Sequence, residues 1–330
     1  MVHVVITGGA GFLGARLARE LLASGVVRVA GDASRLTRLT LIDQAPPPDD
    51  LAADDRVTVS CGDLAELMAP PGGALVGADL IVHLAAAVSA ESEANFDLGM
   101  HANLRATQAL LAAARALRTR PVLVYASSLA VFGGSPEHPL PAVIDDQTAP
   151  WPQTSYGTQK LIGEHLLADY TRKGFLRGRA LRLMTVSVRP GRPNAAASGF
   201  LSGIIREPLA GQRAVCPVGP DVAAALASPA KAVAALLRAA AATEAEWGDQ
   251  TAVTMPALTV TVAEMAAALE RVAGPQVSAL IDWVPDPVIA AIVTGWPAHV
   301  QADRAARLGL TPDPDFDSVI RMHVAETASA

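Results

Sequence analysis

The chain has 330 residues, about half of them apolar, and a net charge of −6. This length favours one large domain or a domain with a smaller lobe, and an acidic balance without a clustered basic segment argues against nucleic-acid binding. Charges such as Lys231 and Arg238 interrupt the longest apolar runs, so no membrane span is expected.

Short apolar strands alternate with helices through residues 1–188. Continuous apolar strands that alternate with helices predict a parallel sheet covered on both faces. The predicted fold class is therefore α/β, a doubly wound Rossmann sheet. The pattern predicts strands at 2–7, 39–43, 56–63, 78–86, 121–128 and 178–188, and helices at 15–24, 101–118 and 155–172.

The sequence changes character after Arg189, where residues 189–199 are rich in proline, glycine and arginine. Such a segment is typical of a loop that leaves the sheet. The remainder of the chain predicts a smaller mixed lobe that closes over the sheet. Its expected elements are helices near 199–210, 229–242 and 261–273 and strands within 251–260 and 280–285.

The cysteines and histidines give little sign of a disulfide or a metal site. Cys61 and Cys216 are expected to be free thiols, and the seven histidines show no ligand-like spacing. The first residues enter an apolar strand without the pattern of a signal peptide. We therefore expect a cytoplasmic protein without a structural metal.

Three glycines, Gly8, Gly11 and Gly14, follow the first strand and open the first helix. Glycine is needed where the turn takes positive φ, where backbone approaches a pyrophosphate, and where helix and strand pack closely. The N-terminus of the helix then faces the phosphates. The spacing predicts a dinucleotide site.

A carboxylate at the end of the second strand would accept hydrogen bonds from the adenosine ribose and repel a 2′-phosphate, which selects NAD over NADP. Asp43 ends the strand 39–43, but it lies farther from Gly14 than the usual spacing of about 20 residues. Asp32 is therefore a competing candidate. We prefer Asp43 because 39–43 is the cleaner strand, with residues 26–38 as an inserted connection.

Two further strand ends carry candidate residues. Asp63, after the third strand, can meet adenine, cap the helix that begins at Leu64, or do both. Small residues that include Ala85 follow the fourth strand, where backbone would pass close to a dinucleotide, and a substrate site could begin at Ser89. His83 is interpreted as a core histidine.

Ser127 and Ser128 end the fifth strand, and Tyr156 and Lys160 lie one turn apart at the start of the next predicted helix. Tyrosine has a pKa near 10, so it acts as a base at neutral pH only when a cation favours its phenolate. Lys160 supplies that charge. A serine can hydrogen-bond the substrate oxygen while the tyrosinate takes its proton and hydride leaves for a nicotinamide.

These motifs resemble, in order, those of the extended short-chain dehydrogenase/reductase family, the NAD-dependent epimerase/dehydratase group. The matching segments are "TGGAGFLG", "GDL", "HLAA", "SSLAVFG", "SYGTQK" and "DRAARLGLTP", spread over nearly the whole chain. The resemblance implies an NAD-binding Rossmann domain at 1–188, with segments near 225–258 returning to it. It leaves 189–224 and 259–330 as a substrate-binding lobe.

The resemblance also implies roles for individual residues. Ser128, Tyr156 and Lys160 would be catalytic, and Asn103 matches the family's helix asparagine beside the active site. The expected cofactor contacts are Gly8, Gly11, Phe12, Leu13, Asp43, Asp63, Leu64, Ala85, Asn103, Tyr156, Lys160 and Val186. The expected substrate contacts are Ser89, Ser128, Tyr156, Thr185, Arg189, Arg192 and Asn194.

Within the family, the segment 181–209 looks most like enzymes that oxidise a four-carbon sugar acid at carbon 2, although Met184 replaces an expected proline. Arg189, Arg192 and Asn194 follow the sixth strand, where a carboxylate and hydroxyls need donors. A small sugar acid, NAD and a homodimer through the helices 101–118 and 155–172 are the expected partners. A sugar-nucleotide epimerase or dehydratase and a non-catalytic NAD sensor or scaffold are the alternatives.

Overall fold

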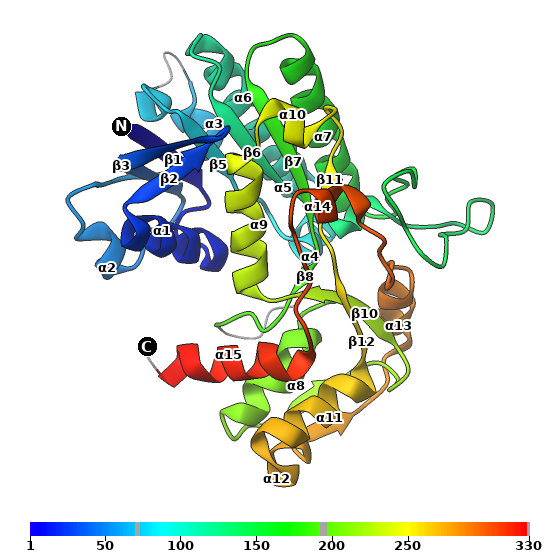
Figure 1. Ribbon diagram of the computed structural model, residues 1–330. Helices are drawn as coiled ribbons and strands as arrows, with labels where there is room; N and C mark the ends of the chain where they lie inside the picture. Colours follow the sequence, from blue (N-terminus) through cyan, green and yellow to red (C-terminus); the bar gives the residue numbers. More distant parts are fainter. Residues whose placement is uncertain (70–72, 192–196, 329–330) are drawn as a thin grey trace. The chain divides into compact units, whose positions relative to one another are not determined.

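The computed structural model describes residues 1–69, 73–191 and 197–328. The chain divides into two compact units, which Figure 1 shows with their elements labelled. Unit 1 comprises Met1–Val131, Thr154–Arg182 and Val233–Thr254. Unit 2 comprises Phe132–Gln153, Leu183–Ala232 and Met255–Ala330. It includes residues 132–153, which the sequence-based boundaries assigned to the first domain.

Unit 1 is built on a sheet with the strand order β11-β7-β6-β5-β1-β3, and β4 pairs with β3 on the outer side. The strand pairs β1–β3, β3–β4, β1–β5, β5–β6 and β7–β11 are parallel. The direction of winding reverses at β1, which confirms the predicted doubly wound α/β fold. The strands are β1(Val2–Thr7), β3(Asp32–Asp43), β4(Val57–Cys61), β5(Leu80–His83), β6(Val122–Ser128), β7(Arg177–Leu183) and β11(Val253–Thr254).

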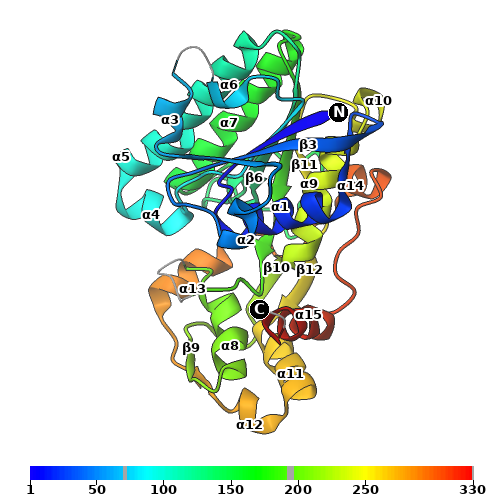
Figure 2. The ribbon, with the colours of Figure 1, turned by 90° about the vertical axis from the view of Figure 1, so that its left-hand side faces the viewer.

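Helices cover both faces of this sheet, which explains why β1 and β5 are mostly apolar and are buried along their whole length. Figure 2 shows α6 and α7 on one side of the sheet and α9 on the other. On the α6 and α7 side, Leu110 and Leu167 pack with Ile81 and Leu123. The main helices are α1(Phe12–Ser24), α6(Ala106–Ala116), α7(Ser155–Arg172) and α9(Pro229–Ala241).

Residues 26–38 are not the connection that the sequence suggested. They form a β-hairpin in which β2(Val26–Val29) runs antiparallel to the first half of β3, with Val29 opposite Asp32. The two turn residues, Ala30 and Gly31, both have positive φ, 49° and 97°, as a type I′ turn requires. Alanine is rare in that conformation, which is why the pattern gave no hairpin signal.

Two predicted strands are each split. Residues 178–188 form β7 and then β8(Thr185–Val186), which pairs with β10 in a separate sheet. Residues 251–260 form β11 and then β12(Leu258–Thr261), and only β11 belongs to the large sheet. Pro256 lies between β11 and β12, where its missing N–H cannot continue a ladder of hydrogen bonds.

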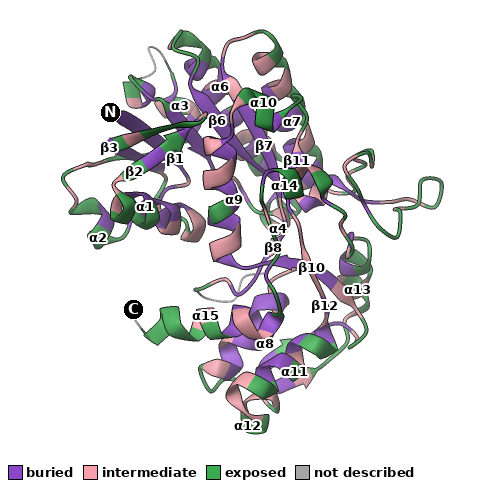
Figure 3. Cartoon of the chain, viewed as in Figure 1, coloured by how far each residue is buried: buried purple, intermediate pink, exposed green. Residues whose placement is uncertain are grey.

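Unit 2 contains a three-stranded sheet, β12-β10-β8, and a parallel pair, β13–β9. The helices α8(Phe200–Leu209), α11(Val262–Ala273) and α15(Phe316–Ala328) pack around a core that includes Ile204, Leu269 and Ile320. Figure 3 shows that α8 and α11 each present a buried face. The strands not yet given are β9(Ala214–Cys216), β10(Ala223–Ala227) and β13(Ile281–Trp283).

The remaining elements are short. They are α2(Asp49–Ala52), α3(Leu64–Leu67), α4(Ser89–Ala94), α5(Phe96–Gly99), the π-helix η2(Met100–Arg105), α10(Glu244–Trp247), α12(Pro275–Ser278), α13(Pro287–Thr294), α14(Asp303–Arg307) and the 3₁₀ turns η1(Gly73–Leu75) and η3(Leu129–Val131). None of the helices in the described ranges is long and apolar enough to cross a membrane. Within the same ranges, no group of histidine, cysteine, aspartate or glutamate side chains could hold a metal ion.

Candidate active site

The glycine turn between β1 and α1 leaves no space for side chains at two positions. A Cβ on Gly8, whose φ is +74°, would lie 2.7 Å from the backbone nitrogen of Ala85. A Cβ on Gly14 would lie 2.0 Å from the carbonyl oxygen of Gly8. Helix α1 begins at Phe12, and Gly11 before it has no side chain to cap the first N–H groups. These N–H groups suit phosphate oxygens, so the turn fits a dinucleotide pyrophosphate.

Asp43 lies beside this turn. Its Oδ2 accepts a hydrogen bond from the N–H of Ala10 at 2.9 Å, and its Oδ1 accepts one from the N–H of Gln44 at 2.7 Å. Asp32, the competing candidate, is the first residue of β3, whereas Asp43 is the last. At about 3.3 Å per residue, the two carboxylates are separated by roughly 35 Å of strand. Only Asp43 is next to the glycine turn, and its contact with the ribose stays a prediction.

Asp63 caps α3, as expected, because its Oδ1 accepts a hydrogen bond from the N–H of Glu66 at 3.1 Å. Its Oδ2 lies 2.8 Å from Nε2 of His101, a partner that the sequence did not suggest. Burial alone would raise the pKa of Asp63, but the hydrogen bonds from His101 and Glu66 lower it overall. The first residue of α3, Leu64, is buried.

The three predicted catalytic residues lie in unit 1, Ser128 at the end of β6 and Tyr156 and Lys160 in the first turns of α7. Nζ of Lys160 donates a hydrogen bond to the carbonyl oxygen of Ala126 at 2.9 Å. The same nitrogen lies 5.6 Å from the centre of the Tyr156 ring and 4.9 Å from that of Tyr125. Both phenol rings therefore lie close to one cation.

Lys160 is 3% exposed, and burial lowers its pKa to about 8, although the charge of Glu164 opposes that shift. The side chain is therefore still mostly charged at neutral pH. A cation at this distance favours the phenolate form of a tyrosine. For the buried Tyr125, loss of hydration and the nearby Tyr156 and Glu164 raise the pKa well above its usual value, so Tyr125 stays a neutral phenol.

A buried ion pair holds α7 against the sheet, and the sequence analysis missed it. Nε and Nη2 of Arg182 on β7 donate to the two carboxylate oxygens of Glu164 at 2.9 and 2.7 Å. Oγ of Ser127 on β6 donates to Oε1 of Glu164 at 2.5 Å. Glu164 follows Lys160 by one helical turn, so the pair fixes the helix that carries both predicted catalytic side chains.

Asn103 lies in the π-helix η2, and its side chain is buried. Its Oδ1 accepts a hydrogen bond from the N–H of Ala87 at 2.8 Å, and its Nδ2 donates to Oε1 of Gln159 at 2.7 Å. It therefore ties the segment after β5 to α7. Ser89, a predicted substrate contact, is the half-buried first residue of α4.

His83 has the structural role that the sequence analysis gave it. Its Nδ1 lies 2.6 Å from Oγ1 of Thr7, and its Nε2 lies 2.9 Å from Oγ1 of Thr107. Complete burial, with a contribution from the charge of Lys160, lowers its pKa to about 3. A neutral, fully hydrogen-bonded imidazole is a core residue, not a proton carrier at neutral pH.

The predicted substrate residues beyond Leu183 belong to unit 2. Thr185 and Val186 form β8. Nη2 of Arg189 donates to Oγ and to the carbonyl oxygen of Ser198 at 3.1 and 3.2 Å. Arg192 and Asn194 lie outside the described residues. Contacts of these side chains with a substrate stay predictions.

Comparison with known proteins decides the family. A model of the NAD dependent epimerase/dehydratase family matches residues 4–252, which is most of the chain. The chain belongs to this family. The match begins in β1 and ends just before β11, so it spans the glycine turn, Ser128 and the first turns of α7.

Relatives in this family align with the chain along its length. A D-erythronate dehydrogenase of Cupriavidus necator is 47% identical over 100% of both chains. A D-erythronate dehydrogenase of Haemophilus influenzae is 39% identical over 98% of this chain and 99% of its own. A solved structure described as a nucleoside-diphosphate-sugar epimerase of Agrobacterium tumefaciens is 39% identical, with a TM-score of 0.91 over 99% of this chain and 95% of its own.

These findings confirm the predicted family, NAD as cofactor and an NAD-dependent dehydrogenase as the enzyme class. The described residues fit NAD. The turn at Gly8 and Gly14 excludes every side chain, α1 opens without a side-chain cap, and a carboxylate stands next to the turn. The roles of individual residues in binding and catalysis are proposals.

Proposed function

We propose that the protein oxidises D-erythronate at carbon 2 to the corresponding 2-keto acid. Two relatives that carry the name D-erythronate dehydrogenase support this substrate, since they align along nearly the whole chain. The proposal is carried by the position of Lys160, whose Nζ is 5.6 Å from the ring centre of Tyr156. A buried cation next to a tyrosine produces a base that can act on a hydroxyl group.

In the proposed reaction, Tyr156 takes the proton of the carbon-2 hydroxyl, and Lys160 stabilises the phenolate that this step needs. Oγ of Ser128 accepts a hydrogen bond from the N–H of Ala130 at 3.1 Å, so its own proton can be donated to the substrate oxygen. NAD, when bound, accepts the hydride from carbon 2. The ion pair between Glu164 on α7 and Arg182 on β7 keeps Tyr156 and Lys160 in place.

We propose that the cofactor is held mainly by unit 1. Gly8, Gly11, Phe12 and Leu13 would receive the pyrophosphate at the start of α1, because N–H groups there have no capping side chain. Asp43 would receive the adenosine ribose. Further proposed contacts are Asp63 and Leu64 with adenine, and Ala85, Asn103, Tyr156, Lys160 and Val186 with the remainder of the cofactor.

The carboxylate of a four-carbon acid provides much of its orientation, and a guanidinium matches it with two parallel hydrogen bonds. We propose Arg189 or Arg192 for this contact, with Ser89, Thr185 and Asn194 as further substrate contacts. Ser198 already orients the Arg189 side chain through two hydrogen bonds. A fixed guanidinium loses less side-chain entropy when it binds an anion.

Steady-state kinetics with NAD test the substrate, read as NADH absorbance with a panel of four- to six-carbon sugar acids. D-Erythronate should give the highest kcat/KM. Arg189→Lys should reduce kcat/KM by roughly 10- to 100-fold, the equivalent of the ~1.5–3 kcal/mol of one charged hydrogen bond, with NAD affinity unchanged. Arg213→Lys is the matched control, since Arg213 is exposed and pairs with Asp282. If neither Arg189 nor Arg192 variants change any sugar acid's kinetics, the carboxylate is bound elsewhere.

A sugar-nucleotide epimerase is the second candidate, since the Agrobacterium structure of 39% identity carries that description. Such an enzyme returns the hydride and produces no net NADH. UDP-sugars in the same panel distinguish the two: epimerisation without NADH accumulation, and no NADH with any sugar acid, would favour the epimerase.

We also propose a homodimer in the cytoplasm. Exposed Phe96 and Leu98 on α5 and Ile162 on α7 offer apolar area for a second copy beside the predicted helices. Cys61 and Cys216 are both free thiols, which suits a reducing compartment. Light scattering after gel filtration tests the dimer, and a monomer mass at micromolar concentration would contradict it.

A further inference from the structure

Backbone strain in unit 1 is concentrated at one place. Among the described residues, Ala30, Arg118 and Arg120 are the non-glycine residues with positive φ, at 49°, 56° and 55°. This conformation is unfavourable for residues with a Cβ, and it persists where the surroundings require it. Ala30 and Arg120 line the same cavity of about 440 Å³. Arg118 directly precedes Thr119, which also lines this cavity.

The cavity lies at the edge of the sheet opposite to the glycine turn. Arg120 stands just before β6, and Arg177 is the first residue of β7, whereas Ser128 ends β6. Strand β6 spans roughly 20 Å at about 3.3 Å per residue step, and Arg120 lies before its first residue, so about that length of strand separates Arg120 from Ser128. The cavity is therefore separate from the residues proposed for NAD and substrate.

Its walls are joined by hydrogen bonds. The N–H groups of Ala30 and Gly31 donate to the carbonyl oxygens of Ala240 and Ala241 at 2.9 and 2.8 Å. The tip of the β2–β3 hairpin is thereby attached to the end of α9. A Cβ on Gly31 would lie 2.9 Å from Thr243, so this contact is close. The tip of the hairpin, which carries none of the proposed cofactor contacts, thus contributes Ala30 to the lining of the cavity.

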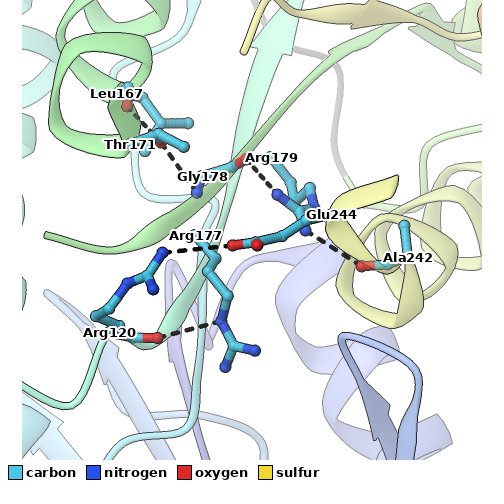
Figure 4. A network of polar contacts seen from close by, with 8 residues as sticks. All are labelled: Arg120, Leu167, Thr171, Arg177, Gly178, Arg179, Ala242 and Glu244. Atoms are coloured by element: carbon cyan, nitrogen blue, oxygen red, sulfur yellow. Dashed lines mark hydrogen bonds and ion pairs between the residues drawn. The ribbon is translucent and has the colours of Figure 1, made fainter. Parts of the chain in front are cut away.

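The charges at the cavity are unbalanced. Nη2 of Arg120 lies 3.4 Å from Oε1 of Glu244 in an exposed ion pair, the kind that contributes little stability. Nε of Arg177 donates to the carbonyl oxygen of Arg120 at 3.2 Å, as Figure 4 shows. The two terminal nitrogens of Arg177 have no hydrogen-bond partner within the described ranges. They are available to an anion in the cavity.

A third guanidinium, that of Arg179, lies next to Glu244 in Figure 4 and is 2% exposed. It donates to the carbonyl oxygens of Gly178 and Ala242 at 3.0 and 3.2 Å, while its buried Nε has no partner in the described chain. Burial lowers its pKa to about 10, so it stays charged at neutral pH. Of the three guanidinium groups, that of Arg120 is the one paired with Glu244 among the contacts of the described residues.

We propose that this cavity binds a small anion bearing a carboxylate or phosphate group, with Arg177 and Arg120 as its main ligands. The forked N–H groups of arginine match the oxygen spacing of both anions. Glu244 competes for Arg120, with which it is paired when the anion is absent. The lining residues keep one positive charge, that of Arg177, after Arg120 pairs with Glu244, and the buried Arg179 adds a second charge behind the lining. This balance suits a ligand with more than one negative charge.

The test uses the full chain with saturating NAD, so that the pyrophosphate site is occupied. Inorganic phosphate and malonate are titrated separately by calorimetry, against potassium chloride at matched ionic strength. Phosphate or malonate should bind, and Arg177→Ala should weaken that binding about tenfold or more, the loss of one charged hydrogen bond. Glu244→Gln should strengthen it, because a competing carboxylate is removed. Arg172→Ala, an exposed pair with Asp169 on α7, is the control.

Opposite effects of Arg177→Ala and Glu244→Gln, with the control unchanged, support the site. Whether phosphate or malonate binds more tightly identifies the anion class. Equal binding by wild type and Arg177→Ala, or no saturable heat with either anion beyond that of chloride, would overturn the proposal. Far-ultraviolet circular dichroism establishes that each variant is folded before the titration is interpreted.

Discussion

The charged side chains at the two edges of the unit 1 sheet differ in burial and in their hydrogen-bond partners. At the carboxyl edge, Lys160 and Glu164 are buried, and each has a partner, a carbonyl oxygen for the lysine and Arg182 for the glutamate. At the amino edge, Arg120 and Glu244 are exposed, and the terminal nitrogens of Arg177 have no partner in the described residues. A fully hydrogen-bonded buried network makes a protein rigid, whereas an exposed, hydrated guanidinium can exchange its water for a ligand.

Strand β3 and strand β6 each connect these edges. Asp32 and Asp43 are the first and last residues of β3, and Arg120 and Ser128 stand at the two ends of β6. On β3 an aspartate stands at each end of the strand, so the same residue type can be compared at both edges. Variants at matched positions can measure how much the charged side chains at the carboxyl edge and at the amino edge differ in their effects on activity and stability.

The largest effect is expected at Tyr156, the base proposed at the carboxyl edge. Tyr156→Phe keeps the ring and removes the proton acceptor, so kcat should fall by ~10²- to 10⁴-fold with little change in NAD affinity. Turnover from NADH absorbance and Kd for NAD from calorimetry measure the two quantities. Turnover within threefold of wild type would show that another group takes the proton.

The next largest effect is expected on stability, from the buried ion pair at the carboxyl edge. Arg182→Met leaves the carboxylate of Glu164 buried without its bidentate partner, since the Arg182 and Glu164 side chains are 10% and 6% exposed. Losing one partner of a buried ion pair typically destabilises a protein by ~3–5 kcal/mol. Urea denaturation should report a loss of that size.

Arg172→Met is the matched control for Arg182→Met. Arg172 pairs with Asp169 on the same helix, but these side chains are 59% and 55% exposed. Its loss should change the free energy of unfolding by less than ~1 kcal/mol. Similar losses for both variants would show that burial does not set the strength of these pairs. The double variant Glu164→Gln/Arg182→Met should recover part of the loss, because no buried charge then lacks a partner.

The carboxyl edge was readable from the sequence because its chemistry depends on short, local spacings. Gly8 and Gly14 lie in one turn, and Tyr156 and Lys160 lie one helical turn apart, so the motif contains the geometry. His83 and the cap at Asp63 were readable for the same reason. Their positions follow from strand ends that apolar runs define.

The features that the sequence did not reveal depend on distant pairs. Glu164 meets Ser127 and Arg182 across three elements, and no spacing along the chain links them. The β2–β3 hairpin was missed because Ala30 takes a turn conformation that asparagine or glycine normally signals. The split of the strands at Met184 and Pro256 arises from pairing with β10 in unit 2, which only the tertiary structure defines.

Two variants at opposite ends of β3 test which carboxylate sets the preference for NAD over NADP. Asp43→Ser should raise the ratio of kcat/KM for NADP over NAD by about tenfold, because it removes a carboxylate that repels a 2′-phosphate and binds the ribose. Asp32→Ser should leave that ratio unchanged, since Asp32 is at the far end of the strand. If Asp32→Ser shifts the ratio and Asp43→Ser does not, the ribose contact has been assigned to the wrong carboxylate.

The smallest effect is a pH dependence of stability from Lys160. Its pKa in the folded protein is about 8, whereas an unfolded lysine releases its proton near 10.4. Between these values the unfolded chain binds more protons than the folded one, so the free energy of unfolding should rise with pH, by at most ~1.4 kcal/mol per unit. Below pH 8 both states are protonated, and the contribution is flat.

Lys160→Met isolates this contribution, because every other titrating group is shared with the wild type. Urea denaturation at pH 7.5, 8.5 and 9.5 should show the wild type gaining stability relative to Lys160→Met, by about 1 kcal/mol over the last step. The constant loss from the missing hydrogen bond to Ala126 does not alter that slope. Lys173→Met, at an exposed lysine that follows the same helix, is the control for the removal of a lysine charge. A difference in the free energy of unfolding between wild type and Lys160→Met that stays constant with pH would contradict this prediction. It would mean that Lys160 is fully hydrated in the folded protein, so that water reaches the carboxyl edge of the sheet.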